Sequence, residues 1–120
     1  MIPILQQSEI LIATVESALT DVDLQKLSKA LVGKVGQSRA RGVILDLTAL
    51  DVLDSFASRM LRDLSDMIRM RGAETVIVGI QPEVAFSMVQ LGITLENVTT
   101  RLDLEEGLEY LNKASRNGRG

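Results

Sequence analysis

The sequence predicts a single α/β domain with a mixed, mostly parallel sheet of about four to five strands flanked by about four helices. Three observations support this fold class. The chain has 120 residues, which fits one domain. Short β-branched runs alternate with segments of helical periodicity, and this order favours crossover units. Two of the runs are mostly apolar, as in strands buried on both faces. We expect a single domain over 1–120, with its core over 3–113 and a frayed tail over 114–120.

The N-terminal part is expected to form a hairpin over residues 3–16. The first strand ends at Leu5, residues 6–9 turn the chain, and residues 10–15 are rich in β-branched side chains. A helix then begins near Thr20 or Asp21, because Thr20 is a good N-cap and acidic residues favour the first turn. Gly36 is its expected stop.

The middle of the chain contains the two buried strands, at 42–47 and 74–80, and a helix between them at 55–70. A further helix is expected from Pro82 to Gly92, followed by a weak strand at 98–101 and a last helix at 103–113. The predicted order is therefore β-β-α-β-α-β-α-β-α.

Composition excludes several functional classes. There is no Cys and no His, which removes thiolate and imidazole nucleophile systems and the usual zinc ligands, so we expect no catalytic residues, no metal and no cofactor. Formal net charge is −3, with 13 Lys and Arg against 16 Asp and Glu, so no nucleic-acid partner is expected. No apolar run reaches the ~20 residues of a membrane span, and we expect a cytoplasmic protein with no membrane contact.

The strongest local feature is an acidic segment that leads into a helix. Asp46 ends a buried strand, Asp51 and Asp54 follow, and Ser55 opens the helix. Ligand sites of open α/β sheets lie beyond the carboxyl ends of the strands, so the place suits a functional site. A serine at a helix N-terminus has backbone N–H groups nearby that can receive a phosphate, and the phosphate adds about −1.5 to −2 charges at pH 7.

A purely structural interpretation of the same residues is the commoner one. Asp54 or Ser55 serves as an N-cap in this interpretation, because Ser and Asp are the usual cap residues. Ser58, one turn further on, is a second candidate acceptor. Residues 32–38 lack the spacing of a phosphate loop and lie in a predicted helix, so they are not taken as a nucleotide site.

The residues over 43–48 and 51–55, Val-Ile-Leu-Asp-Leu-Thr and Asp-Val-Leu-Asp-Ser, resemble the signature of STAS domains, the fold of anti-sigma-factor antagonists. The predicted element order resembles this family over almost the whole chain. The resemblance implies that Ser55 is phosphorylated by a partner kinase, with Asp46, Asp51, Asp54 and Phe56 in the switch loop and partner contact.

One departure from simple sigma antagonists points to a branch of the family. Those proteins have a small residue and a glycine after the serine, whereas this chain has Phe56 and Ala57. The pattern resembles the stressosome scaffold branch, which is RsbS-like. It implies a switch serine/threonine kinase (RsbT-like), a sensor STAS paralogue (RsbR-like) in a large co-assembly, a resetting phosphatase and self-association.

Two alternatives stay open at this point. The chain can be a simple anti-sigma-factor antagonist that binds an anti-sigma kinase, or a STAS module that binds a small ligand or nucleotide. An enzyme would need carboxylate or lysine chemistry, and the four lysines lie on predicted helix faces away from Asp54.

Overall fold

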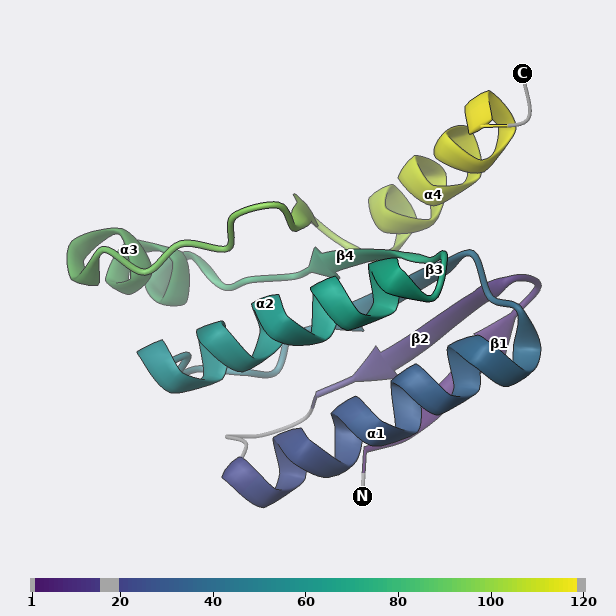
Figure 1. Ribbon diagram of the computed structural model, residues 1–120. Coiled ribbons are helices and arrows are strands. Elements are labelled where there is room, and N and C mark those ends of the chain that lie inside the picture. Colours follow the sequence, from purple (N-terminus) through teal and green to yellow (C-terminus); the bar gives the residue numbers. More distant parts are fainter. Residues whose placement is uncertain (1, 16–19, 119–120) are drawn as a thin grey trace.

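The computed structural model describes residues 2–15 and 20–118, and in this part of the chain five strands form one sheet in the order β1-β2-β3-β4-β5 (Figure 1). The first two strands pair antiparallel, and every later neighbour pairs parallel. The strands are β1 (Ile4–Gln7), β2 (Ile10–Thr14), β3 (Gly42–Asp46), β4 (Glu74–Val78) and β5 (Thr99–Arg101). The predicted fold class and element order are confirmed.

The helices form a layer on each face of the sheet. Figure 1 shows α1 (Asp21–Ser38) and α2 (Ser55–Met70) side by side on one face, and α4 (Leu104–Gly118) on the other. The remaining helix, α3 (Pro82–Leu91), lies beyond the carboxyl ends of the strands. Because α2 follows a strand of a parallel sheet, its N-terminus lies at this same end.

Two apolar clusters correspond to the two faces of the sheet. Neighbouring side chains of a strand point to opposite faces, so Leu45 faces the α1–α2 layer while Ile44 faces α4, and both are fully buried. On the α4 side, Gly107 lies so close to the sheet that an added Cβ would be 2.8 Å from Val78 Cγ1. Each strand therefore fixes helices on both sides of the sheet.

The hairpin is tighter than its sequence predicts. Strand β1 continues to Gln7, and the turn needs only Ser8 and Glu9. Ser8 adopts a left-handed φ of 56°, a conformation that short polar residues tolerate in tight turns. Glu16, the last residue of the predicted hairpin, lies outside the described residues.

Helix α1 begins as predicted and ends later. Thr20 and Asp23 form a capping box, with Asp23 N donating to Thr20 Oγ1 at 3.1 Å and Thr20 N donating to Asp23 Oδ2 at 3.2 Å. Gly36 is not the stop: the helix continues to Ser38, and Arg39 ends it with a φ of 54°. Helix α4 likewise continues past the expected end at Lys113, through Gly118.

Candidate functional site

The loop between β3 and α2 begins with a hydrogen-bonded turn. Asp46, at the end of β3, accepts two hydrogen bonds through Oδ1, from Thr48 N at 2.9 Å and from Thr48 Oγ1 at 2.6 Å. An Asp side chain that bonds the backbone two residues on is a typical turn-forming device. The Asp46 carboxylate therefore orients the start of the loop and is part of its frame.

Three buried leucines fix the rest of the loop. Leu47, Leu50 and Leu53 are 1%, 2% and 6% exposed, and the residues between them point to solvent. Leu47 N also donates to Val78 O of β4 at 2.9 Å. Asp51 is exposed and Val52 is 62% exposed. The buried leucines thus anchor the loop backbone, and the loop exposes both polar and apolar side chains to solvent.

The start of α2 decides which residue is the cap. Asp54 is the N-cap, and its Oδ1 accepts from Ala57 N at 2.7 Å. Ser55 is the first residue of the helix and is exposed. Of the two cap candidates, Asp54 has the role, and the Ser55 hydroxyl is left on the surface beside the helix N-terminus. The first N–H groups of a helix have no intrahelical acceptor, so the surroundings of Ser55 suit an anion.

Ser58 has a different environment from Ser55. It is 1% exposed, and its Oγ has no hydrogen-bond partner within residues 2–15 and 20–118. A kinase would have to open the second turn of α2 to reach this hydroxyl. Phe56, in contrast, is 41% exposed, so it is available to a partner. The structure brings Asp46, Asp51, Asp54, Ser55 and Phe56 into one loop and helix start and places Ser58 beneath them.

Sequence reasoning missed a second support of this loop, which comes from the β4–α3 connection. Gln81 Nε2 donates to Thr48 O at 2.7 Å. Gly79 has a φ of +78°, and a Cβ there would lie 2.0 Å from Thr48 Oγ1. The glycine is thus required both by its backbone conformation and by the close approach of Thr48. The sequence contains only a short turn over residues 79–82, between strand and helix, and that turn does not by itself predict the contact with Thr48.

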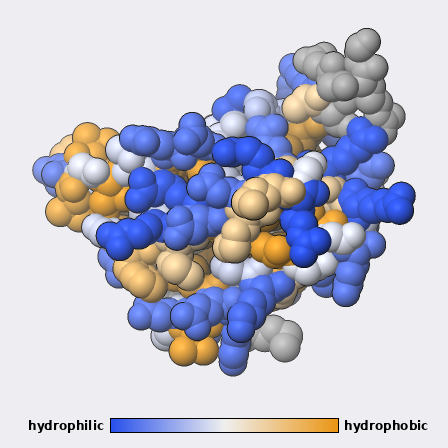
Figure 2. All heavy atoms as spheres, viewed as in Figure 1, coloured by the Kyte–Doolittle hydropathy of each residue, from blue (hydrophilic) through white to orange (hydrophobic). Residues whose placement is uncertain are grey.

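Helix α3 adds an apolar surface at the same end of the molecule. Only Val84 and Met88 of this helix are buried, while Phe86, Val89 and Leu91 are 64%, 80% and 69% exposed. Figure 2 shows this gathering of apolar side chains over α3. Exposed apolar residues of this density favour a protein contact.

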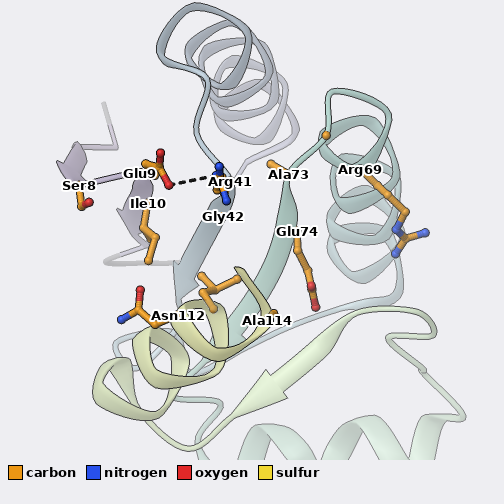
Figure 3. A pocket seen from close by; sticks show the side chains of 12 residues that line it. Ser8, Glu9, Ile10, Arg41, Gly42, Arg69, Ala73, Glu74, Asn112 and Ala114 are labelled. Atoms are coloured by element: carbon orange, nitrogen blue, oxygen red, sulfur yellow. Dashed lines mark ion pairs between the residues drawn. The ribbon is translucent and has the colours of Figure 1, made fainter. Parts of the chain in front are cut away.

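A metal site would need grouped carboxylates, and a nucleotide site would need a hollow with cations free to meet phosphate. In residues 2–15 and 20–118 no group of three or more acidic residues is placed to hold a metal ion. A hollow of about 630 Å³ lies at the other end of the sheet, against the hairpin turn (Figure 3). Its cations already have anionic or carbonyl partners: Arg41 Nε is 3.0 Å from Glu9 Oε2, and Arg69 Nη2 donates to Asn97 O at 2.7 Å. Both arginines that line this hollow therefore have partners within the chain.

Comparison with known proteins identifies the family. Residues 1–107 match the STAS domain family. The chain belongs to this family.

Among curated relatives, the RsbT co-antagonist protein RsbRA of Bacillus subtilis (strain 168) is 31% identical over 85 residues, which are 71% of this STAS domain and 31% of that protein. The chain thus spans about a third of the length of the curated relatives it matches.

Two solved structures match over nearly their whole length. Moorella thermoacetica RsbS with a serine-to-glutamate substitution has a TM-score of 0.81 and 28% identity, covering 96% of this chain and 97% of that one. A chain from a structure of the stressosome, described as a signal integration and transduction hub, has a TM-score of 0.79 and 30% identity, covering 95% and 99%. The predicted resemblance to the RsbS-like branch is confirmed at the level of fold and sequence similarity.

In the described part of this STAS domain, none of the helices combines the length and apolar character needed to cross a membrane.

Proposed function

We propose that this STAS domain is a non-enzymatic, phospho-regulated scaffold of a cytoplasmic stressosome, which sequesters a switch serine/threonine kinase (RsbT-like) until Ser55 is phosphorylated. The observation that carries the proposal is the position of Ser55. It is the exposed first residue of α2, directly after the residue that caps the helix. A phosphate added there requires no burial and removes no cap.

The electrostatics of the loop give the phosphate its effect. Asp54 already uses its carboxylate on Ala57 N, so a phosphate on Ser55 is adjacent to an ionised neighbour. Two unit charges 4 Å apart in water repel by about 1 kcal/mol, and the phosphate carries almost twice a unit charge. The helix N-terminus offsets about 0.3–1 kcal/mol of this repulsion. Phosphorylation therefore leaves the fold intact and makes the surface strongly negative.

The partner surface follows from what lies beside Ser55. Exposed apolar side chains on the loop and the helix start, Val52 and Phe56, accompany the apolar surface of α3 at the same end of the sheet. A kinase that buries these residues would also bury Ser55. A phosphate added to Ser55 would then be a charged group buried in the interface, which is unfavourable. Release of the kinase is the expected consequence.

The remaining partners come from the relatives. Four of the curated relatives are RsbT co-antagonist proteins of the RsbR group, and one matching solved structure is of the stressosome. We propose an RsbR-like sensor paralogue as the co-assembling partner, and a separate phosphatase that resets Ser55.

Incubation with the switch kinase and ATP, followed by peptide mass spectrometry, tests the acceptor. Phosphate is expected on Ser55, and Ser55→Ala should abolish it while Ser58→Ala leaves it unchanged, because Ser58 is buried. Phosphate on Ser58 in the Ser55→Ala chain, or none in residues 55–58, would reject the assignment.

A binding measurement tests the switch itself. Ser55→Glu should weaken kinase binding at least tenfold with an unchanged melting temperature. Gln37→Glu, on the exposed C-terminal part of α1, adds the same charge away from the site and should bind as the wild type does. Equal affinity of the three chains would contradict the mechanism.

A further inference from the structure

The first turn of α2 differs in charge from the first turns of the other helices. Helices α1, α3 and α4 each carry acidic residues in that turn, whereas α2 carries none after its cap, Asp54. Negative charge near a helix N-terminus is stabilising, because the first N–H groups give that end a partial positive charge. A phosphate on Ser55, the first residue of α2, would supply the negative charge that this turn lacks.

The second turn of the same helix contains an unpaired cation. Arg59 is exposed and makes no hydrogen bond or ion pair with any residue that the structure describes. Asp63, one turn further on, lines the hollow between α1 and α2 and does not pair with Arg59. Neither do the two carboxylates before it: Asp51 lies in the loop, and Asp54 accepts from Ala57 N. The guanidinium of Arg59 is therefore free in the unmodified chain.

The geometry of a helix makes Arg59 a neighbour of Ser55. Helical residues four positions apart lie on the same face, with their Cβ atoms about 5–6 Å apart. The Cα–Cβ bonds of a helix tilt toward its N-terminus, which directs a side chain at position 59 toward the turn that begins at position 55. At this spacing an acidic group that precedes a basic group pairs better than the reverse order. The planar fork of an arginine also matches two oxygens of a phosphate.

The next arginines of α2 are less suitable partners for this phosphate. Arg62 lies about 10 Å from Ser55 along the helix axis, at 1.5 Å per residue. It is half-buried, and its Nε is enclosed by protein atoms without a hydrogen-bond partner among the described residues. Arg69 is further away and already pairs with Asp66, with 3.4 Å between Nη1 and Oδ1. Arg59 combines nearness to Ser55 with an exposed and unpaired guanidinium.

We propose that Arg59 binds the phosphate on Ser55, so that phosphorylation converts a free guanidinium into one half of an ion pair along the first turns of α2. The inference rests on the proposed function for the presence of the phosphate, and it adds the residue that holds it. Phosphorylation then changes the surface in two ways: it adds negative charge at Ser55, and it engages the positive charge near Phe56, which is 41% exposed. A partner carboxylate can meet Arg59 in the unmodified chain and loses this counter-charge in the modified one.

The full chain with phosphoserine installed at position 55 during synthesis allows the ion pair to be measured without any kinase. A ³¹P NMR titration gives the pKa of the phosphate. Because Arg59 favours the doubly ionised phosphate, Arg59→Gln should raise this pKa by about 0.3–0.7, the range expected for an exposed ion pair. Arg59→Lys keeps the charge but loses the planar fork, so its pKa should lie between the other two. An unchanged pKa in Arg59→Gln overturns the proposal.

Two matched variants of the phosphorylated chain show whether position matters or only total charge. Arg62→Gln removes the same charge one turn further along α2 and should raise the pKa of the phosphate by less than half as much as Arg59→Gln. Arg71→Gln removes it at the end of the helix, roughly 24 Å away at 1.5 Å per residue, and should leave the pKa unchanged. That distance exceeds the Debye length, which is about 8 Å at physiological ionic strength. A change in Arg62→Gln as large as that in Arg59→Gln contradicts the assignment.

The guanidinium signals in ¹H–¹⁵N spectra provide a direct view of the pair. The N–H signals of Arg59 should follow the titration of the phosphate and exchange with water more slowly than in the unmodified chain. Those of Arg69, which already pairs with Asp66, should stay unchanged. Arg59 signals that ignore the phosphate titration overturn the proposal. Failure of the switch kinase to modify Ser55 would reject the proposed function and would not alter these spectra, so the two failures can be told apart.

Discussion

Gly79 should be the most sensitive position of the loop that holds Ser55, and a matched glycine allows the reason to be isolated. Gly79 and Gly72 both have left-handed backbones, with φ of +78° and +88°. A Cβ at Gly72 meets nothing within 4 Å, whereas one at Gly79 lies 2.0 Å from Thr48 Oγ1 and 3.1 Å from Thr48 N. Alanine at Gly72 therefore brings backbone strain alone, and alanine at Gly79 brings strain and a collision.

The expected magnitudes follow from these contacts. A left-handed backbone costs an L-residue roughly 1–2 kcal/mol, which sets the loss for Gly72→Ala. In Gly79→Ala the Thr48 hydroxyl must also leave Asp46, to which it donates at 2.6 Å. A hydrogen bond to a charged group is worth about 1.5–3 kcal/mol, and the exposure of Thr48 favours the lower part of that range. We expect Gly79→Ala to lose about 3 kcal/mol, roughly 1.5 kcal/mol more than Gly72→Ala.

Urea unfolding of the two variants and of Thr48→Ala measures this difference. A further loss of about 1.5 kcal/mol moves the midpoint by roughly 0.5–1.5 M. Thr48→Ala should cost the hydrogen bond in the wild type and almost nothing in Gly79→Ala, where that bond is already broken. Equal losses for the two glycine variants, or strictly additive effects of Thr48→Ala, would refute the reasoning.

Three other expectations concern the supports of the helices. Asp54→Ala removes the N-cap of α2 and should lower the free energy of unfolding by about 1 kcal/mol in urea titrations. Added salt should not restore this lost stability. Gly107→Val forces a branched side chain against Val78 Cγ1 and should cost about 1–3 kcal/mol, seen as a lower melting temperature with α4 lifted from the sheet. Hydrogen bonds from the backbone and side chain of Thr20 lower the pKa of Asp23 below its ordinary 3.8. A lowered folded-state pKa contributes stability above the unfolded pKa that is lost as pH falls through the folded value. In an NMR titration, Thr20→Val should move the pKa of Asp23 back toward 3.8.

The elements of this fold were predictable where one physical signal dominates. Helix α2 begins and ends at the predicted residues, because an acidic cap precedes a strong amphipathic repeat. Gly92 ends α3 as expected, with a left-handed φ of 69°. Gly36 misled the prediction because glycine has two uses, as a helix stop and as a small residue in a contact. Only the structure shows that Arg71 crosses over it.

The support of the β3–α2 loop could not be predicted, since it depends on side chains far apart in sequence. Gln81 donates to Thr48 although the two residues are 33 positions apart in sequence. The local sequence around either residue does not predict this contact. The apolar surface of α3 was also hidden in the sequence. Val84 and Val89 look alike in a hydropathy pattern, yet one is 5% exposed and the other 80%. A helix at the end of a sheet has little core to bury into, so periodicity alone overestimates its buried face.

Ser55 can carry a phosphate without loss of the helix start because Asp54, and not Ser55, caps α2. Had Ser55 been the cap, a phosphate there would have removed the hydrogen bond that starts α2, and modification would have coupled to partial unfolding of the helix. Because Asp54 holds Ala57 N at 2.7 Å, the helix start is stable without the Ser55 hydroxyl. The loop tolerates three carboxylates because each has a suitable environment. Asp46 and Asp54 each accept backbone hydrogen bonds, while Asp51 is exposed to solvent. Phosphorylation at this site would therefore change the surface charge while the fold stays the same. Any loss of kinase affinity must then come from changed contacts between the kinase and this surface.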